Sequence, residues 1–366
     1  MKKLSEPVRK VKSQSIGMDV HKKMTVYCVL DRGGRTLEEG QFPSRRADLI
    51  SFLKRVVGRK KSHITFEASR SSLWVYEIVS DFVGAERTHV AQAKRIRAIA
   101  NTSEKNDAND AWWLAYLTYE GRLPEAYVPP KQILELRIAT RERTFAVRQR
   151  TKTVNRLKSH LAQIGEVVPG STIRTEEATL FMAETALKTT GMRGRAIRSC
   201  IDELEYLDAT IAQWEEGIEE IAEHLPEVSL IAREEPGFGV VLAAIVVAET
   251  GDFTRFASQK SYGCFSGLTP SNKSTGGRTI HGGISREGSA HLRWALTQAA
   301  TACCRARSGP GLAVGNWIRA KEKRMGIKSK ARAAGARKLA ESIWRLFHYG
   351  ELFDPARAFG GRRATA

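Results

Sequence analysis

Four acidic residues in the first third of the sequence have the types and spacing of a metal site: Asp19, Glu67, Asp107 and Asp110. Asp19 interrupts an apolar run and Glu67 ends another, and a charged carboxylate buried there without a partner would cost several kcal/mol. Asp107 and Asp110 are three residues apart, so a helix would place them on one face. Four such carboxylates can hold two Mg²⁺ ions about 3.5–4 Å apart, an arrangement used for in-line phosphodiester chemistry, with Mn²⁺ as the alternative ion.

These acids also have structural interpretations. Asp107 would be favourable at the start of a helix because of the helix dipole, and Glu67 could cap the turn at Ser71. His21 could reach the metal site from its position beside Asp19, but we interpret it as an exposed neighbour on the strand. Lys105 lies close to the acids and could hold a backbone phosphate, the alternative being a solvated helix face.

A glycine-rich loop at residues 267–288 offers several serines as possible nucleophiles. The residue types alone do not choose among the candidates in and beside it, which are Ser266, Ser271, Ser274, Ser285 and Ser289. The surroundings of Ser274 suit phosphate chemistry, because glycines permit close backbone approach and bases neutralise charge; the residues are Lys273, Gly276, Gly277 and Arg278. Arg286 adds a further base for nucleic-acid binding.

A Pro-Gly-Phe-Gly turn at residues 236–239 separates two apolar segments with helical spacing. Helix, tight turn and apolar helix is the order of a helix-hairpin-helix motif, in which Gly237 and Gly239 would leave backbone N–H groups free for a phosphate. An ordinary turn between two helices explains the same residues equally well.

The charge of the chain is large and unevenly placed. The 366 residues carry 59 Lys+Arg and 40 Asp+Glu, and the resulting net charge of +19 predicts a polyanionic partner. Residues 202–235 hold twelve acids and one base, whereas residues 278–366 hold 18 bases and five acids. This partition predicts a nucleic-acid-binding face, with the bases of residues 319–332 near Trp317 as a candidate, and a separate protein-facing segment.

The composition excludes several classes of protein. The hydrophobic content of 42% suffices for packed cores, and the longest apolar run, 11 residues, is too short to span a membrane. The basic amino end lacks the apolar segment of a secretory signal, and five cysteines without a CxxC pair indicate reduced thiols. We therefore expect a soluble intracellular protein.

The acids need a scaffold, and the first 120 residues supply strand and helix patterns in the order β-β-β-α-β-α-β-α. Three strands in a meander followed by βαβ crossovers predict an α/β domain with a mixed sheet covered by helices. In such a sheet the first and fourth strands are commonly neighbours, which would bring Asp19 and Glu67 together.

Strand patterns largely disappear between residues 131 and 225, where we expect one helix near 131–164 and another from about 195. The second helix has apolar residues at seven of seven heptad positions: Leu204, Leu207, Ile211, Trp214, Ile218, Ile221 and Leu225. They predict a coiled-coil hairpin or a dimerising coiled coil with acids on its outer faces. An amphipathic helix packed on its own domain is the alternative. A helix at 291–305 and a basic helical tail complete a mainly α C-terminal region.

Two blocks of motifs resemble one family. The segments "IGMDVHKK", "ITFEAS" and "KNDANDAW" resemble the DEDD, RuvC-like domain of insertion-sequence-110-type transposases, and residues 236–296 are similar to the C-terminal transposase domain of that family. Pilin-gene invertases are a related variant. The resemblance covers about residues 14–305 and implies an RNase H/RuvC-like mixed sheet, a helical coiled coil and a mainly α domain. The implied division is a basic tail at 1–13, a RuvC-like DEDD domain at 14–125, a helical coiled-coil region at 126–228, a helix-hairpin-helix and serine transposase domain at 229–310, and a basic helical tail at 311–366.

The resemblance implies a DNA recombinase that mobilises its own insertion sequence. In this family the pattern Gly-Leu-x-Pro, three residues, Ser-[Ser/Thr]-Gly-Gly carries a nucleophilic serine, and the matching residue is Ser274. Arg278 stands where the family often has Lys, which keeps the charge but changes the shape. The implied reaction proceeds through a covalent phosphoserine intermediate, with Mg²⁺ bound by the four acids and a composite site made by two domains.

The implied partners are donor and target DNA, a structured guide (bridge) RNA that pairs with both, and further copies of the chain in a dimer or tetramer held by the heptad. The implied location is the prokaryotic cytoplasm, at the nucleoid. Two other functions fit the residues. A RuvC-like metal-dependent nuclease or junction resolvase would use the acids and water without a serine, and an architectural nucleic-acid binder would use neither.

Overall fold

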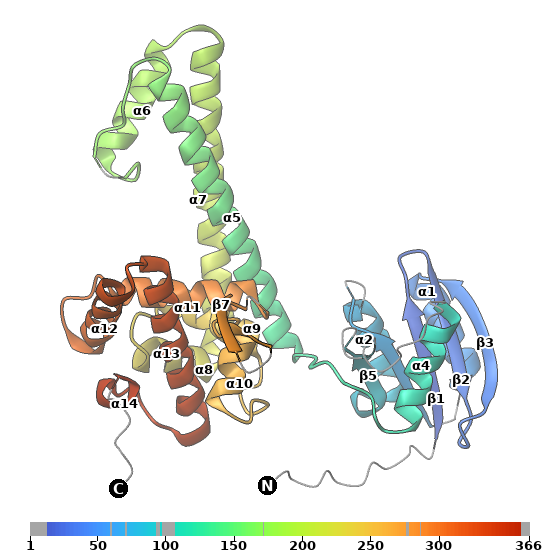
Figure 1. Ribbon diagram of the computed structural model, residues 1–366. Coiled ribbons are helices and arrows are strands. Elements are labelled where there is room, and N and C mark those ends of the chain that lie inside the picture. Colours follow the sequence, from blue (N-terminus) through green and yellow to red (C-terminus); the bar gives the residue numbers. More distant parts are fainter. Residues whose placement is uncertain are drawn as a thin grey trace, which may run out of the picture. The chain divides into compact units, whose positions relative to one another are not determined.

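The computed structural model describes residues 13–58, 61–69, 72–92, 96, 107–170, 172–275, 278–285 and 287–359, with the backbone alone for 271–282. The chain divides into two compact units, Met1–Val128 and Pro129–Ala366. The first unit is an α/β domain and the second is mainly helical (Figure 1). None of the helices in the described ranges is long and apolar enough to cross a membrane.

The first unit contains a five-stranded sheet in the order β3-β2-β1-β4-β5. Its strands are β1 (Gln14–Val20), β2 (Met24–Leu30), β3 (Thr36–Pro43), β4 (Ser62–Glu67) and β5 (Thr88–Ala91). The first three form an antiparallel meander, and β4 and β5 join it in parallel with β1. The predicted mixed sheet is confirmed, including the position of the first strand beside the fourth.

Helices cover both faces of this sheet. They are α1 (Arg46–Val56) and α2 (Ser72–Val83) on one face and α4 (Asp107–Tyr119) on the other, with the short helix η1 (Ala85–Arg87) before β5. Ile16 and Met18 of β1 pack with α1 and α2, as the alternation of side chains along a strand requires. Residues of the opposite parity therefore lie under α4. The sequence also predicts a helix around residues 92–100, of which only residues 92 and 96 lie within the described ranges.

Gly17 allows α4 to lie directly on β1. A Cβ atom at Gly17 would be 2.0 Å from the carbonyl oxygen of Ala111 and 2.5 Å from the backbone nitrogen of Ala115. Only glycine permits so close an approach of the helix backbone. The hydroxyl groups of Thr65 in β4 and Thr118 in α4 share a hydrogen bond of 2.5 Å. These contacts fix α4 against the two central strands.

The second unit begins with a long helical hairpin, α5 (Lys131–Ala162) and α7 (Gly191–Glu223), with α6 (Glu176–Lys188) beside its tip (Figure 1). Five of the seven predicted heptad residues are buried, namely Leu204, Leu207, Ile211 and Ile218 in α7 and Leu225 just after it. Ion pairs join the two helices at seven-residue spacing, with 2.5 Å from Arg143 Nη2 to Glu215 Oε1 and 2.6 Å from Arg150 Nε to Asp208 Oδ1. Two acids expected on outer faces therefore pair with α5, a helix of the same chain.

The rest of this unit packs around the apolar helix α9. Its elements are α8 (Pro226–Glu234), α9 (Val240–Thr250), α10 (Gln259–Phe265), β6 (Pro270–Thr275), β7 (Arg278–Ile284), α11 (Ala290–Cys303), α12 (Gly309–Met325), α13 (Lys328–Tyr349) and α14 (Pro355–Phe359). One core contains Leu136, Ile245, Leu296 and Leu339, so α5, α9, α11 and α13 share it. The glycine-rich segment that we predicted to be a loop contains a two-stranded hairpin, because β6 and β7 pair across it.

Candidate active site

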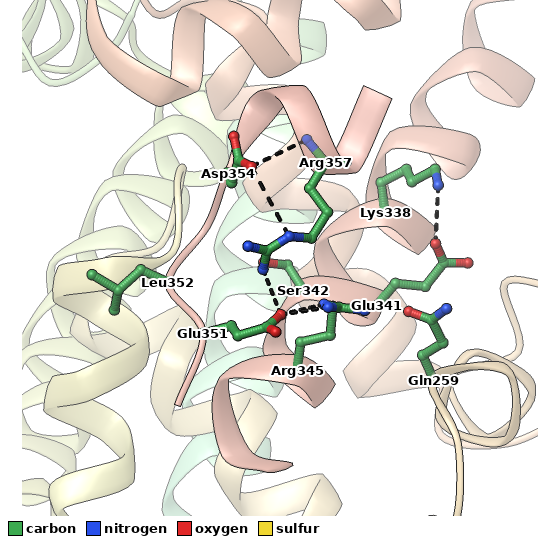
Figure 2. A pocket seen from close by; sticks show the side chains of 10 residues that line it. Gln259, Lys338, Glu341, Ser342, Arg345, Glu351, Leu352, Asp354 and Arg357 are labelled. Carbon is green, nitrogen blue, oxygen red and sulfur yellow. Dashed lines mark hydrogen bonds and ion pairs between the residues drawn. The ribbon is translucent and has the colours of Figure 1, made fainter. Parts of the chain in front are cut away.

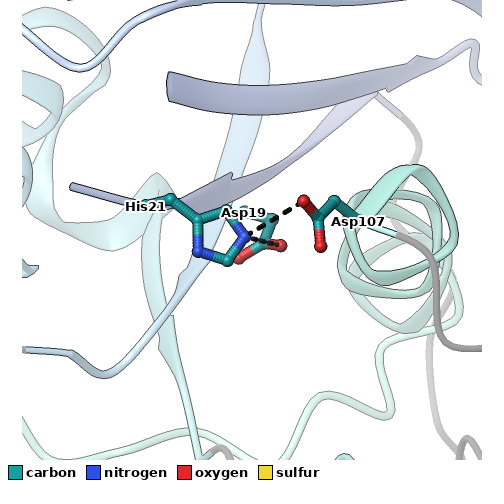
Figure 3. Close-up of side chains that lie close together, drawn as sticks. All are labelled: Asp19, His21 and Asp107. Atoms are coloured by element: carbon teal, nitrogen blue, oxygen red, sulfur yellow. Dashed lines mark ion pairs between the residues drawn. The ribbon is translucent and has the colours of Figure 1, made fainter. Parts of the chain in front are cut away.

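Three side chains bring possible metal ligands together at the carboxyl end of β1. Figure 3 shows the imidazole of His21 pointing toward the carboxylates of Asp19 and Asp107. The Nε2 atom of His21 is 2.8 Å from Asp19 Oδ2 and 3.5 Å from Asp107 Oδ2. One ligand atom from each residue lies within 4.8 Å of the other two.

The local sequence explains this convergence. Gly17 and Asp19 are alternate residues of β1 and share one face of the strand, and His21 follows directly after the strand ends at Val20. The absence of a side chain at Gly17 brings α4 close, and Asp107 is the first residue of that helix. Asp19 and Asp107 therefore meet because a glycine two residues earlier sets the distance between strand and helix.

The electrostatics of the cluster are unfavourable for its acids. Asp19 is only 8% exposed. Burial raises the pKa of the Asp19 carboxyl, the neighbouring charges of Asp107 and Asp110 raise it further, and His21 lowers it. Burying a carboxylate among other acids costs free energy unless a cation or a bound proton neutralises it.

The remaining predicted acids lie near this cluster. Glu67 is the last residue of β4, and the register pairs Met18 with Phe66, so Asp19 and Glu67 occupy the next positions on adjacent parallel strands. Glu67 is not part of the three-residue group of converging ligand atoms. Asp110 acts on Asp19 through its charge. His21 is exposed, as the sequence interpretation expected, and its imidazole also lies beside the carboxylates of Asp19 and Asp107.

The donor set suits a divalent cation. Carboxylate oxygens are the ligands that Mg²⁺ and Mn²⁺ prefer, and an imidazole nitrogen is better matched to Mn²⁺ than to Mg²⁺. Asp19, His21 and Asp107 would hold such an ion, with Asp110 close enough to add its charge.

Three of the five candidate serines have other structural roles. The hydroxyl of Ser266 is buried and donates to the Gly263 carbonyl at 2.8 Å. The hydroxyl of Ser289 caps α11 by accepting from the Leu292 nitrogen at 3.2 Å. The Ser285 hydroxyl accepts from the backbone nitrogen of Glu287 at 3.4 Å.

The other two serines lie in β6, and the structure describes their backbone alone. Ser274 pairs with Thr279 of β7 and Lys273 pairs with Ile280, so Ser274 lies one residue before the end of β6. Arg278 is the first residue of β7 and pairs with Thr275. Four other predicted nucleic-acid contacts lie outside the described residues, namely Lys105, Gly276, Gly277 and Arg286.

The Pro-Gly-Phe-Gly turn has a structural use at its first glycine. Gly237 has a φ of +84°, and a Cβ atom there would be 2.4 Å from the Ala299 carbonyl oxygen of α11. Gly239 precedes α9 and has open space where a side chain would begin. Of the two glycines predicted to bind phosphate, the first is thus already required for the packing of α11.

A second buried carboxylate was not foreseen from the sequence. Glu249 of α9 accepts from Arg141 Nε at 2.8 Å and Nη2 at 3.0 Å, and from the Ser289 hydroxyl at 2.7 Å. Burial alone would raise the pKa of Glu249, but the hydrogen bonds from Arg141 and Ser289 outweigh it and lower the pKa. This carboxylate joins α5, α9 and the start of α11.

The first unit, a mixed sheet with acids at the end of its central strand, is consistent with a RuvC-like domain that binds a divalent metal ion. Comparison with known proteins identifies the family. Residues 16–166 match the family model of IS110-type DEDD transposases, and residues 230–313 match that of the transposase IS116/IS110/IS902 family. The chain belongs to the IS110 family of insertion-sequence transposases.

Similar proteins are also described as transposases. The chain is 25% identical over 342 residues to the transposase for insertion sequence element IS1111A of Coxiella burnetii, covering 92% of this chain and 90% of the relative. It is 29% identical over 259 residues to a probable family 20 transposase of Pseudomonas aeruginosa, covering 69% of this chain and 75% of the relative. The transposase for insertion sequence element IS1328 of Yersinia enterocolitica is 26% identical over 256 residues, with 69% and 74% covered.

Proposed function

We propose that the protein cuts and rejoins DNA through a covalent phosphoserine intermediate, with Ser274 as the nucleophile and a divalent cation bound by the acids of the first unit. The observation that carries the metal-dependent part is the convergence of Asp19, His21 and Asp107, where a buried carboxylate faces further negative charge. A divalent cation is the group that makes this arrangement favourable.

In the proposed reaction the Ser274 oxygen forms a bond to a DNA phosphorus and loses its proton. The bond from that phosphorus to a DNA oxygen breaks, and the leaving strand departs as a hydroxyl. A second DNA hydroxyl then attacks the phosphoserine and releases the serine, so the number of phosphodiester bonds is conserved. A bound Mg²⁺ or Mn²⁺ supplies charge stabilisation at the reacting phosphate.

In this proposal Asp19 and Asp107 would bind the cation and fix its place at the end of β1. Glu67 and Asp110 are proposed as further ligands. Glu67 lies at the same end of the sheet as Asp19, and Asp110 lies in the same turn of α4 as Asp107. The side chains of Lys273, Arg278 and Arg286, together with Lys105 and the backbone of Gly237, Gly239, Gly276 and Gly277, are proposed to contact nucleic acid.

We further propose a structured guide RNA as the source of sequence specificity and a homo-oligomer as the working form. The net charge of +19 supports binding to nucleic acid, and base pairing would leave backbone contacts to the protein. Because α5 covers much of the heptad seam of α7, an oligomer would have to use other surfaces of the hairpin.

The test is incubation with DNA carrying the ends of the insertion sequence, RNA transcribed from that element and Mg²⁺, followed by a denaturing gel. The wild type should give a protein–DNA adduct that is absent in Ser274→Ala and in Asp19→Asn. Ser271→Ala is the matched control, since it removes a hydroxyl from the same strand and should keep the adduct.

A second candidate function is a metal-dependent nuclease that uses water, and the acid cluster alone favours it. Strand cleavage in Ser274→Ala at the wild-type rate, with no adduct in either protein, would establish this alternative and exclude the serine mechanism. Loss of the adduct in Ser271→Ala but not in Ser274→Ala would assign the nucleophile to the other serine of β6.

A further inference from the structure

A groove of about 780 Å³ lies between the base of the β6–β7 hairpin and helices α12 and α13. Its apolar lining includes Pro270 and Ile284 from the hairpin, Trp317 and Met325 from α12, and Ala334 from α13. A volume of this size is within the range of pockets that take small organic molecules, about 300–1,000 Å³. One nucleotide is a molecule of that class.

The charged residues of the groove are predominantly basic. They are Lys321, Lys330, Arg337, Lys338 and one acid, Glu341. Glu341 accepts from Arg337 Nε at 2.9 Å and from Lys338 Nζ at 3.1 Å, so its carboxylate is neutralised by these two bases. Within the part of the chain that the structure describes, no carboxylate lies within ion-pair distance of Lys321 or Lys330.

Lys321 shows the shortage of negative charge most directly. Its Nζ atom lies 4.7 Å from the centroid of the Trp317 ring. Burial lowers the pKa of Lys321, and the neighbouring charges of Arg324 and Lys338 lower it further. A bound anion would relieve this crowding of cations beside an aromatic ring.

A second pocket, which shares Lys338 and Glu341 with the groove, has a different charge balance. Figure 2 shows Arg345 and Arg357 directed at Glu351, with Asp354 beside Arg357. The distance from Arg345 Nη2 to Glu351 Oε2 is 2.5 Å, and Arg357 also pairs with Glu351. The acids of this pocket neutralise its arginines, so it offers an anion much less than the groove does.

We propose that the groove binds an unpaired nucleotide of single-stranded DNA, with the base against Trp317, Met325 and Ala334 and the adjoining phosphates on Lys321 and Lys330. Aromatic and apolar surface combined with cations is the pattern by which proteins bind unpaired nucleotides. The inference rests on the proposed function, because β6, whose first residue Pro270 lines the groove, also contains Ser274. DNA strands become unpaired where a recombinase opens its substrate.

The test measures binding without chemistry. The Ser274→Ala protein is titrated, in EDTA, with a fluorescein-labelled DNA duplex that carries a short overhang of thymidines. The same duplex with an abasic overhang has the same phosphates but no bases. We expect the thymidine overhang to bind about tenfold more tightly, because one base adds apolar contact with the groove. Fluorescence anisotropy at several salt concentrations gives both affinities.

Two variants separate the base from the phosphate. Ala334→Leu fills the groove without changing charge and should remove the preference for thymidine over abasic DNA. Lys321→Ala should weaken both overhangs and reduce the slope of log affinity against log salt by about 1. Lys323→Ala is the matched control on α12, because it removes the same charge from a pocket on another side of the helix and should keep the base preference.

Three outcomes would overturn the proposal. They are equal binding of the thymidine and abasic overhangs, an unchanged preference in Ala334→Leu, and tighter binding of an overhang made of RNA than of DNA. The last result would assign the groove to RNA. The binding assay needs neither Ser274 nor a metal ion, so it is independent of the adduct assay. A failed binding assay beside a positive adduct assay would reject the groove proposal and leave the recombinase proposal standing. A positive binding assay beside a failed adduct assay would reject the recombinase proposal and leave the groove proposal standing.

Discussion

Asp19 in the first unit and Glu249 in the second are both buried carboxylates, but their surroundings differ in sign. Glu249 receives a two-pronged hydrogen bond from Arg141 and another from Ser289, and its pKa is lowered. Asp19 has two further acids near it and one half-exposed imidazole, and its pKa is raised. Glu249 is neutralised by the fold, whereas Asp19 is left with an excess of negative charge.

Glu235 is a third buried carboxyl group, and it is stabilised in a different way from Asp19 and Glu249. One of its oxygens accepts from the Ser342 hydroxyl at 2.9 Å, and the other is buried with no protein partner among the described residues. Burial raises the pKa of Glu235 to about 8, so the residue carries a proton near neutral pH. A buried acid can therefore be stabilised by an arginine, by a proton or by a metal ion, and only the last of these offers chemistry at a phosphate.

The largest expected effect concerns Asp19. Asp19→Asn should lower the rate of DNA cleavage by about 10³-fold or more, because the charge stabilisation supplied by a bound metal is worth several kcal/mol. The melting temperature in EDTA should not fall, since the variant removes one of several like charges. Asp81→Asn, an exposed acid of α2, is the control and should keep full activity. Wild-type cleavage by Asp19→Asn would show that this carboxylate does not hold a metal ion required for the reaction.

The next effect is a pH dependence of stability at Glu235. In the unfolded chain the carboxyl loses its proton near pH 4.5, while the folded protein retains it up to about pH 8. Folding stability should therefore fall as the pH rises between these values, by about 1 kcal/mol per pH unit, and be fully present below them. Glu235→Gln should remove this slope and be the more stable protein at pH 8.

Urea unfolding at several pH values measures the effect of Glu235. The control Glu223→Gln changes an exposed acid at the end of α7 and should keep the wild-type slope. A Glu235→Gln protein with the same pH profile as the wild type would mean that the residue is ionised in the folded state.

Gly17→Ala tests how the acid cluster is positioned. The new methyl group would collide with the α4 backbone, so we expect a loss of about 2 kcal/mol and weaker binding of Mn²⁺, since Asp107 moves with α4. Gly217→Ala in α7 has open space around it and should gain up to about 1 kcal/mol. Scanning calorimetry measures the change in stability, and titration calorimetry measures the affinity for Mn²⁺. Unchanged Mn²⁺ affinity in Gly17→Ala would contradict the role given to this glycine.

The smallest effect is expected at Glu249. Glu249→Gln should lower the free energy of unfolding by about 1–2 kcal/mol, less than for a fully buried pair because Arg141 is 48% exposed. Binding of Mn²⁺ should not change, in contrast to Asp19→Asn. Glu142→Gln on the exposed face of α5 is the control for unfolding in urea. Equal stability of Glu249→Gln and Glu142→Gln would show that the pair of Arg141 and Glu249 does not stabilise the fold.

The sequence patterns were sufficient for most of the first unit. Short strand and helix patterns along the chain predicted five strands and three helices in the observed order, because these patterns depend on neighbouring residues alone. The helical hairpin was also visible as a heptad, but the partner of that heptad was not, since an apolar seam does not say which helix will cover it. The hairpin of β6 and β7 was missed because its glycines and serines lack the apolar alternation of a strand.

The amino-acid sequence by itself determined the mixed sheet, the four candidate acids, the basic surplus and the family motifs, because these depend on residue type and short-range spacing. The tertiary structure decided which acids meet. Gly17 sets the approach of α4 to β1, and this distance brings Asp107 and His21 to Asp19. It also decided that Glu249 is paired with an arginine 108 residues away. Such pairings depend on packing between distant elements, which no local pattern of residues specifies.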